Sequence, residues 1–302
     1  PKAVEFMQYY NDLVGNYPYK QYSIIQGGDG GMEYGMCTLI LGEGTYEGMI
    51  KSTISHEMAH TWFQFLLANN ESKHPWMDEG FSTYIEYHAV NSIFKEGKEN
   101  PLEAVYNTYI NLARSWIEQP LTTQGDRYEF NRAYSRASYY KGAVFLSQLG
   151  YIIGEENLNL TIKKYFKDFV FKHPKPLDII RTAEKISGLE LDWYLIDFAQ
   201  TTNTIDYGVK SINGKSITLE RIGLMPMPID VTVTYVDGST EDFYIPLQMM
   251  RGEKPTAATL IKDWAWAYPT YTFKTSKVVK AVEIDPTGMM ADIYKVNNIN
   301  RI

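Results

Sequence analysis

The periodicity of the apolar residues changes near residue 203, and this change limits the chain to folds that join a helical part to a β-rich part. Before this point apolar side chains recur every three or four residues, as they do along one face of a helix. After it they alternate with polar side chains, as in strands with one buried face. We therefore expect an α+β protein of two domains, 1–203 and 204–302.

The pattern of residues 1–203 predicts mainly helices with a small amount of strand. We expect helices at 47–68, 78–93, 138–153, 158–171 and 177–186. Asp178 is expected to cap the last of these. A strand is expected at 21–26 and one further extended stretch at 32–41, on either side of the glycine-rich segment 27–31.

The second part predicts antiparallel strands. Val231–Val236, the turn residues Asp237 and Gly238, and the stretch Glu241–Leu247 have the pattern of a β-hairpin. Val279–Ile284 reads as another strand. About 100 residues of alternating pattern without a helix favour a β-sandwich as a separate domain.

Composition excludes several classes of function. With 36 acidic residues against 29 Lys and Arg, the net charge is −7, which argues against nucleic acid as the main partner. The single cysteine, Cys37, excludes an internal disulfide and any multi-cysteine metal site. Apolar runs such as Phe65–Ala68 are far shorter than the roughly 20 residues of a transmembrane helix. We expect a soluble chain, and cytoplasmic, secreted and periplasmic locations remain open.

One pentapeptide carries metal chemistry. His56 and His60 are four residues apart on the predicted 47–68 helix, so both imidazoles project from one face at the separation that two ligands of one zinc ion need. Glu57 is rotated by about 100° from His56, which suits it to face a metal-bound water as general base. The alternative is that the pentapeptide arose by chance, so corroboration has to come from a third ligand.

Three residues are candidates for that third ligand. Glu79 follows His60 after eighteen residues and opens the next predicted helix, so two antiparallel helices would bring it opposite the histidines. The alternative role for Glu79 is a first-turn glutamate favoured by the helix dipole. His74, in a predicted loop, and His88, on an apolar stripe that suits a core position better, compete with it.

Together these residues resemble the M1 family of zinc aminopeptidases, a gluzincin family. The resemblance rests first on His-Glu-x-x-His, eighteen residues and then Glu within Trp-x-x-Glu-Gly-Phe. The segment Gly30-Gly31-Met32-Glu33 is similar to the family's Gly-x-Met-Glu-Asn exopeptidase motif, and Tyr139-Tyr140-Lys141-Gly142 is similar to its Tyr-x-Lys-Gly motif. The likeness runs from Gln21 to about Asn203.

The resemblance implies a fold and a reaction. It implies a mainly helical, thermolysin-like catalytic domain with a small sheet at 1–203, followed by a β-sandwich domain at 204–302. It implies one zinc ion per chain, held by His56, His60 and Glu79. The substrates are peptides with a free N-terminus, whose first peptide bond is cleaved by zinc-activated water.

It also implies roles for single residues. Glu57 takes the proton of the attacking water and passes it to the leaving amine, while Tyr139 donates a hydrogen bond to the oxyanion. Glu33 binds the α-ammonium of the substrate. Gly30, Gly31 and Met32 belong to the same substrate-binding motif, and the two glycines allow the substrate to approach the backbone.

The sequence also departs from the family pattern. Tyr34 stands where the exopeptidase motif has Asn, and Thr61 stands where members often have Gln. The family's N-terminal β domain is not in this sequence. A compact member and a fragment are both open, and we favour a fragment whose missing domain packs on the catalytic one. A thermolysin-type zinc endopeptidase and a catalytically idle zinc-binding scaffold module are the rival interpretations.

Overall fold

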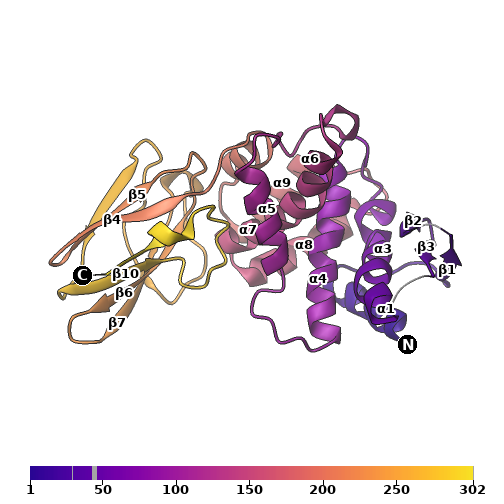
Figure 1. The fold of residues 1–302 in the computed structure, drawn as a ribbon, viewed down its shortest axis with the longest axis horizontal. Helices are drawn as coiled ribbons and strands as arrows, with labels where there is room; N and C mark the ends of the chain where they lie inside the picture. Colours follow the sequence, from indigo (N-terminus) through magenta and orange to yellow (C-terminus); the bar gives the residue numbers. More distant parts are fainter. Residues whose placement is uncertain (29, 43–45, 302) are drawn as a thin grey trace.

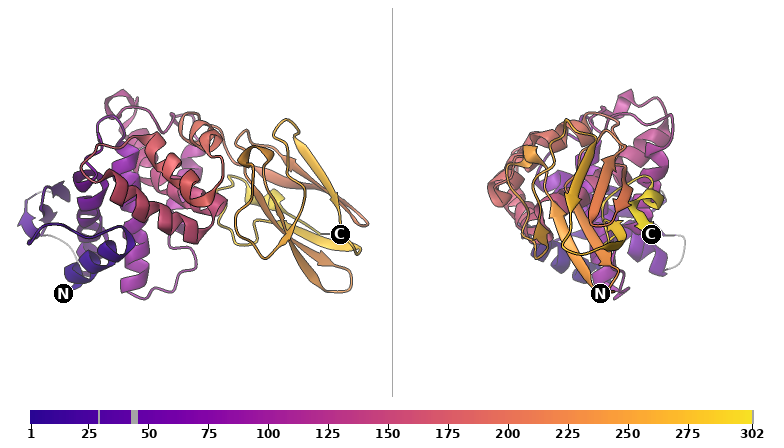
Figure 2. Two further views of the ribbon diagram at one scale, coloured as in Figure 1. Left: turned by 180° about the vertical axis from the view of Figure 1, so that it is seen from behind. Right: turned by 90° about the vertical axis from the view of Figure 1, so that its left-hand side faces the viewer.

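The computed structural model describes residues 1–28, 30–42 and 46–301, and it shows a chain of mixed helix and strand. The molecule is elongated, with the β-rich C-terminal third at one end and the helices filling the rest (Figure 1). The view from behind shows the same separation (Figure 2). None of the described helices combines the length and hydrophobicity needed to cross a bilayer.

All five predicted helices are present, with shifted ends. The α-helices are α1 (Lys2–Leu13), α2 (Tyr46–Gly48), α3 (Ser55–Ala59), α4 (Phe81–Ile93), α5 (Glu103–Ala113), α6 (Asn131–Ser135), α7 (Gly142–Ile153), α8 (Glu155–Phe169), α9 (Pro176–Ser187) and α10 (Asp192–Tyr194). Wider, π-helical turns occupy Met49–Ile54, Thr61–Leu66, Trp76–Gly80, Arg136–Lys141 and Leu195–Ala199. Asp178 caps α9 as predicted, because its Oδ2 accepts the backbone N–H of Lys175 at 2.7 Å. Helix α5 was not predicted.

A small sheet lies beside the helices at the N-terminal end of the molecule (Figure 1). Its strands β1 (Ser23–Gly27), β3 (Cys37–Leu41) and β2 (Met32–Tyr34) are in that spatial order. The prediction of one extended stretch at 32–41 is wrong, because the chain turns at Gly35 and Met36, where Met36 has a φ of 61°. The turn makes β2 and β3 a hairpin and puts β2 at the sheet edge. Asp29, in the glycine-rich segment, lies outside the described residues.

Two glycines set the crossing of the two helical segments that carry site residues. A Cβ built on Gly80 would lie 2.5 Å from the Cα of Gly142 and 2.8 Å from the carbonyl oxygen of Ser138. The segment Trp76–Gly80 therefore touches the segment Arg136–Lys141 and the start of α7 backbone to backbone. Only glycine permits so close an approach.

The β-rich part holds two sheets. Their strands are β4 (Tyr207–Asn213), β5 (Ser216–Arg221), β6 (Ile229–Tyr235), β7 (Thr240–Ile245), β8 (Thr259–Leu260), β9 (Thr270–Lys274), β10 (Val279–Ile284) and β11 (Ile299–Arg301). One sheet has the order β11-β10-β6-β7-β8 and the other β4-β5-β9. The predicted hairpin is confirmed in β6 and β7, with Gly238 in the turn at a φ of 85°. The β-sandwich domain and the boundary at 203 stay predictions.

A buried amide joins the helical part to the β-rich part. Gln148 of α7 is fully buried, and its Nε2 donates to the carbonyl of Met289 at 2.9 Å. Its Oε1 accepts the backbone N–H of Ala291 at 2.9 Å, and the hydroxyl of Tyr106 also donates to Met289. The apolar core runs through both parts without interruption. The two parts therefore meet across a desolvated, hydrogen-bonded junction.

Candidate metal and catalytic site

The helix that bears the two histidines is irregular. Helix α3 holds His56, and π-helical turns flank it on both sides. Just beyond His60 the backbone of Phe63 leaves the helical region, with φ −105° and ψ 84°. Its freed carbonyl accepts a hydrogen bond from the hydroxyl of Ser82 at 3.1 Å and lies 3.2 Å from Nδ1 of His60. Single π-helical turns of this kind are frequent at functional sites.

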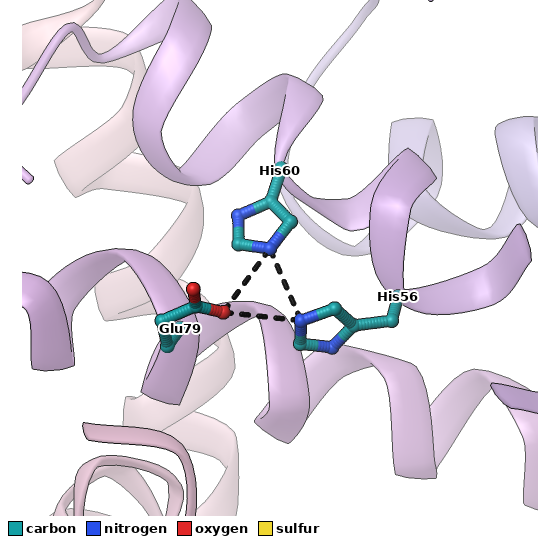
Figure 3. Close-up of side chains that lie close together, drawn as sticks. All are labelled: His56, His60 and Glu79. Atoms are coloured by element: carbon teal, nitrogen blue, oxygen red, sulfur yellow. Dashed lines mark hydrogen bonds and ion pairs between the residues drawn. The ribbon is translucent and has the colours of Figure 1, made fainter. Parts of the chain in front are cut away.

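His56, His60 and Glu79 converge on one point (Figure 3). The two Nε2 atoms are 3.1 Å apart, and Oε2 of Glu79 lies 3.1 Å from Nε2 of His56 and 3.3 Å from Nε2 of His60. His60 is 1% exposed and the other two are largely buried. The predicted juxtaposition of the helix pair thus exists, with Glu79 coming from the π-helical turn before α4.

Two further carboxylates hold the imidazoles from behind. Oε2 of Glu86 lies 2.9 Å from Nδ1 of His56, and Oδ1 of Asp78 lies 2.5 Å from Nδ1 of His60. These contacts leave both Nε2 atoms directed at the common point. Sequence reasoning missed both residues, although Asp78 adjoins Glu79 and Glu86 follows Glu79 by seven residues, which is about two helical turns.

The electrostatics of the cluster favour a cation. Burial alone would lower the pKa of His56, but its hydrogen bonds with Glu79 and Glu86 outweigh burial and raise that pKa to about 9. The pKa of His60 is raised in the same way, against burial, by Asp78 and Glu79. Burial would raise the pKa of Glu79, yet both imidazoles hold it below its usual range. A metal ion bound here would replace protons that the carboxylates otherwise hold on the rings.

The donor set fits a catalytic zinc ion, for which two histidines and a glutamate are a known combination. The two alternative candidates for the third ligand, His74 and His88, lie elsewhere. Within the described part of the chain, neither belongs to a group of converging ligand atoms. His88 instead packs its ring 4.5 Å from that of Tyr84, and burial lowers its pKa to about 4. His88 is therefore partly buried beside the core and away from the metal cluster.

Gly31 packs directly on Glu57. A Cβ at Gly31 would collide with the Glu57 carboxylate and would lie 2.8 Å from Cγ2 of Thr53. Glu57 is 8% exposed, and burial raises its pKa to about 7. The absent side chain at Gly31 therefore makes room for the carboxylate, whereas a Cβ at Gly30 would meet no described atom within 4 Å.

Glu33 lies on the edge strand β2 and points at the same cluster. One of its carboxylate oxygens lies within 4.8 Å of ligand atoms of Glu57 and His60. Its Oε1 is 3.5 Å from Nε2 of Gln64. A cavity of about 730 Å³ adjoins it, lined among others by Met32, Glu33, Glu79 and Tyr134.

Tyr139 lies on the helical segment Arg136–Lys141. Its ring stacks on that of His56, with centroids 5.5 Å apart and planes 16° from parallel. Burial, and next the charge of Glu79, raise the pKa of its phenol, so the hydroxyl remains a hydrogen-bond donor. The segment is anchored by fully buried Lys141, whose Nζ donates to Glu118 at 2.8 Å.

A second cavity, of about 300 Å³, adjoins these groups. Gly31, His56, Glu57 and Tyr139 contribute to its lining. The structure thus brings together, from four separate stretches of chain, every residue that the sequence predicts for the site except Gly30, which lies beside it in the open. The roles of these residues remain proposals.

Comparison with known proteins gives three findings. The Peptidase family M1 domain matches residues 2–198. "Endoplasmic reticulum aminopeptidase 2" of Homo sapiens is 29% identical over 245 residues, which cover 76% of this chain and 25% of that protein. "Aminopeptidase M1-D" of Oryza sativa subsp. japonica is 25% identical over 177 residues, covering 56% of this chain and 20% of that protein.

The fold has solved counterparts. The crystal structure of a mutant M1 zinc metallopeptidase from Deinococcus radiodurans superposes with a TM-score of 0.55 and 18% identity, covering 66% of this chain and 44% of that one. At this identity the likeness concerns the fold. The present chain spans about a fifth to a quarter of the length of the two curated relatives.

Replacing Glu86 by Gln tests whether the outer carboxylates support a metal site. The amide still fills the space but accepts the Nδ1–H bond of His56 more weakly, so we expect zinc affinity to fall about 10- to 100-fold. Affinity is measured by competition with a chromophoric chelator, and thermal unfolding verifies the fold. Glu96→Gln, which removes a carboxylate paired with Lys51 instead, serves as the matched control. Equal affinity in both variants would contradict a supporting role for Glu86.

Proposed function

We propose a zinc aminopeptidase activity for this chain, which belongs to peptidase family M1. The observation that carries the proposal is the convergence of His56, His60 and Glu79 beside a buried general-base candidate and an edge-strand carboxylate. The substrates are peptides with a free N-terminus, and the product is the first amino acid. The groups that the proposal assigns to the reaction surround one point in the structure.

His56, His60 and Glu79 would hold one zinc ion per chain. Zinc in such a set lowers the pKa of water to about 7 and polarises a carbonyl. Glu86 and Asp78 accept hydrogen bonds from the Nδ1 positions and keep the imidazoles in one orientation. Their burial means that the rings cannot turn without leaving a carboxylate unpaired.

Glu57 moves the proton. Its carboxylate accepts a proton from the water that attacks the first peptide carbonyl and then gives it to the leaving amine. A pKa raised to about 7 by burial suits a group that must both accept and donate near neutral pH. Gly31 supports this role because it leaves the carboxylate uncrowded.

Tyr139 and Glu33 bind the two ends of the reacting group. The Tyr139 phenol, kept protonated, donates a hydrogen bond to the carbonyl oxygen as negative charge develops there. Glu33 pairs with the substrate α-ammonium. We assign substrate binding to the backbone groups of Met32, which begins the edge strand β2, and of Gly30 and Gly31, which precede that strand.

The architecture belongs to the same proposal. We assign 1–203 to a thermolysin-like catalytic domain and 204–302 to a β-sandwich domain. The change from helices to strands between Ala199 and Tyr207, and the pairing of the later strands into two sheets, support the division.

Two rival functions explain less of the site. A thermolysin-type endopeptidase has no need for a carboxylate such as Glu33 close to the metal cluster. An idle zinc-binding scaffold needs neither Glu57 under Gly31 nor Tyr139 against His56. The three functions differ in what happens when the substrate's amino group is blocked.

Cleavage of matched free and N-acetylated peptides tests the activity. Acetylation removes the positive charge that Glu33 binds, so we expect turnover of acetylated peptides to fall below detection while free peptides are cleaved. The zinc-loaded chain is assayed by mass spectrometry of the products. Cleavage of both peptides favours the endopeptidase, and cleavage of neither favours the scaffold.

The Glu57→Gln variant tests the general base. The amide cannot accept a proton, so we expect kcat to fall by about 10³-fold or more while stoichiometric zinc remains bound. Metal content and turnover are measured on the same sample. Glu47→Gln, at an exposed position of the same helical stretch, is the control and should keep full activity. Retained turnover in Glu57→Gln refutes the role.

Tyr139→Phe tests the oxyanion donor. The ring still stacks on His56, but the hydroxyl is gone, so we expect kcat to fall about 10²- to 10³-fold with little change in KM. Steady-state kinetics on an aminoacyl arylamide separate the two constants. Tyr268→Phe, at an exposed tyrosine of the β-rich part, is the control and should have little effect. A change mainly in KM would show that Tyr139 binds substrate instead.

A further inference from the structure

The smaller of the two cavities at the metal cluster contains a buried hydroxyl group that lacks a partner. His56, Glu57 and Tyr139 line this cavity of about 300 Å³, and so does Thr83 of α4. Thr83 is 3% exposed, and its Oγ1 has no hydrogen-bond partner among the described residues. A buried hydroxyl without a partner is unfavourable, because it has lost its hydrogen bonds with water. A ligand in the cavity can supply the missing hydrogen bond.

Thr83 lies on the face of α4 that is turned toward the metal cluster. Glu86, three residues further along the helix, has its Oε2 2.9 Å from Nδ1 of His56. Tyr87, four residues further along, lines the same cavity as Thr83. Residues three and four apart on a helix are neighbours, with about 5–6 Å between their Cβ atoms. The unpaired hydroxyl is therefore about one helical turn from a residue that contacts the cluster.

The two cavities correspond to the two sides of the bond that is cleaved. Glu33 lines the cavity of about 730 Å³, whereas Glu57 lines the smaller one. In the proposed reaction Glu33 binds the α-ammonium, which is on the same carbon atom as the first side chain, so that side chain lies in the larger cavity. Glu57 gives its proton to the leaving amine, which belongs to the second residue. The second side chain therefore lies in the smaller cavity.

The lining of the smaller cavity favours a short, neutral side chain with a hydroxyl group. Glu57 and Glu86 line it, so an acidic side chain would be repelled. A hydroxyl both donates and accepts, so it can pair with the Thr83 hydroxyl in either direction. Serine and threonine carry their hydroxyl on Cβ, close to the backbone and so close to the cluster. Lysine and arginine carry their charge at the end of a long chain, which would place it beyond Thr83.

Resting on the function proposed above, we propose that this cavity binds the side chain of the second substrate residue and that Thr83 selects serine or threonine there. The Thr83 hydroxyl pairs with the substrate hydroxyl. Valine has nearly the shape of threonine but leaves Thr83 unpaired, and a site built to hydrogen-bond a group discriminates against an analogue that lacks it. Thr83 is thus a specificity-determining residue of the proposed aminopeptidase.

Cleavage of Ala-Thr-Ala and Ala-Val-Ala in one mixture tests this proposal. The peptides differ only by a hydroxyl in place of a methyl group, and the ratio of their products gives the ratio of kcat/KM whatever the amount of active protein. We expect the zinc-loaded chain to favour the threonine peptide by about fivefold, the effect of one hydrogen bond. In Thr83→Val the preference should disappear. In Thr83→Ser, which keeps the hydroxyl, it should remain.

Thr182→Val is the matched control. Thr182 is also 3% exposed and helical, but it lies in α9 and donates to the carbonyl of Asp178 at 2.8 Å. Its replacement should keep the full preference for threonine. Equal cleavage of both peptides by the wild-type chain, or a preference that survives in Thr83→Val, overturns the assignment of Thr83. If valine prevents folding, Thr83→Ala removes the same hydroxyl with a smaller side chain.

Calorimetry on the zinc-loaded Glu57→Gln chain separates this proposal from the proposed activity. Absence of all cleavage by the wild-type chain refutes the aminopeptidase activity, and the affinities for the two peptides then decide on the cavity alone. Tighter binding of the threonine peptide that is lost when Thr83→Val is added supports the assignment of Thr83. Equal affinities of the two peptides overturn it.

Discussion

The pairing of each imidazole with a buried carboxylate is the interaction on which the site depends. Asp78 and Glu86 hold His60 and His56 from behind, and Glu79 approaches them from the front. All three acidic residues come from one continuous stretch, the π-helical turn before α4 and α4 itself. The position of that single stretch against α3 therefore sets both the direction of the rings and the site of the third donor. The same contacts set the electrostatics of the cluster and give it its preference for a cation.

The same stretch also makes a backbone contact with a second helical segment. Gly80 and Gly142 let the stretch that carries Glu79 touch the stretch that carries Tyr139. Gly31 does the same between the sheet edge and Glu57. In both places a missing side chain brings reactive groups within reach of one another. The glycines of two sequence motifs thus have a packing reason that is independent of any ligand.

Much of this could be predicted from sequence because it follows from local spacing. Two histidines four apart must share a helix face, and the turn at Asp237 and Gly238 must close a hairpin. Features that depend on contacts between distant segments could not be predicted from the sequence. The turn at Met36 follows a single glycine, Gly35, in a stretch that otherwise has β-compatible side chains, and one glycine does not by itself distinguish a turn from a bulge. The π-helical turns leave no mark on the apolar pattern. Asp78 and Glu86 were missed because the sequence alone does not distinguish an acidic residue that pairs with a histidine from an acidic residue on the surface of a helix. Only the packing of the helices distinguishes the two.

The junction between the helical and β-rich parts has a consequence for motion. The side-chain amide of Gln148, out of contact with water, forms hydrogen bonds with the backbone of Met289 and of Ala291. A hinge rotation between the two parts would break these hydrogen bonds. It would leave the polar groups unpaired in an apolar interior, at a cost of several kcal/mol. The buried hydrogen bonds at α7 therefore oppose hinge motion between the helical and β-rich parts.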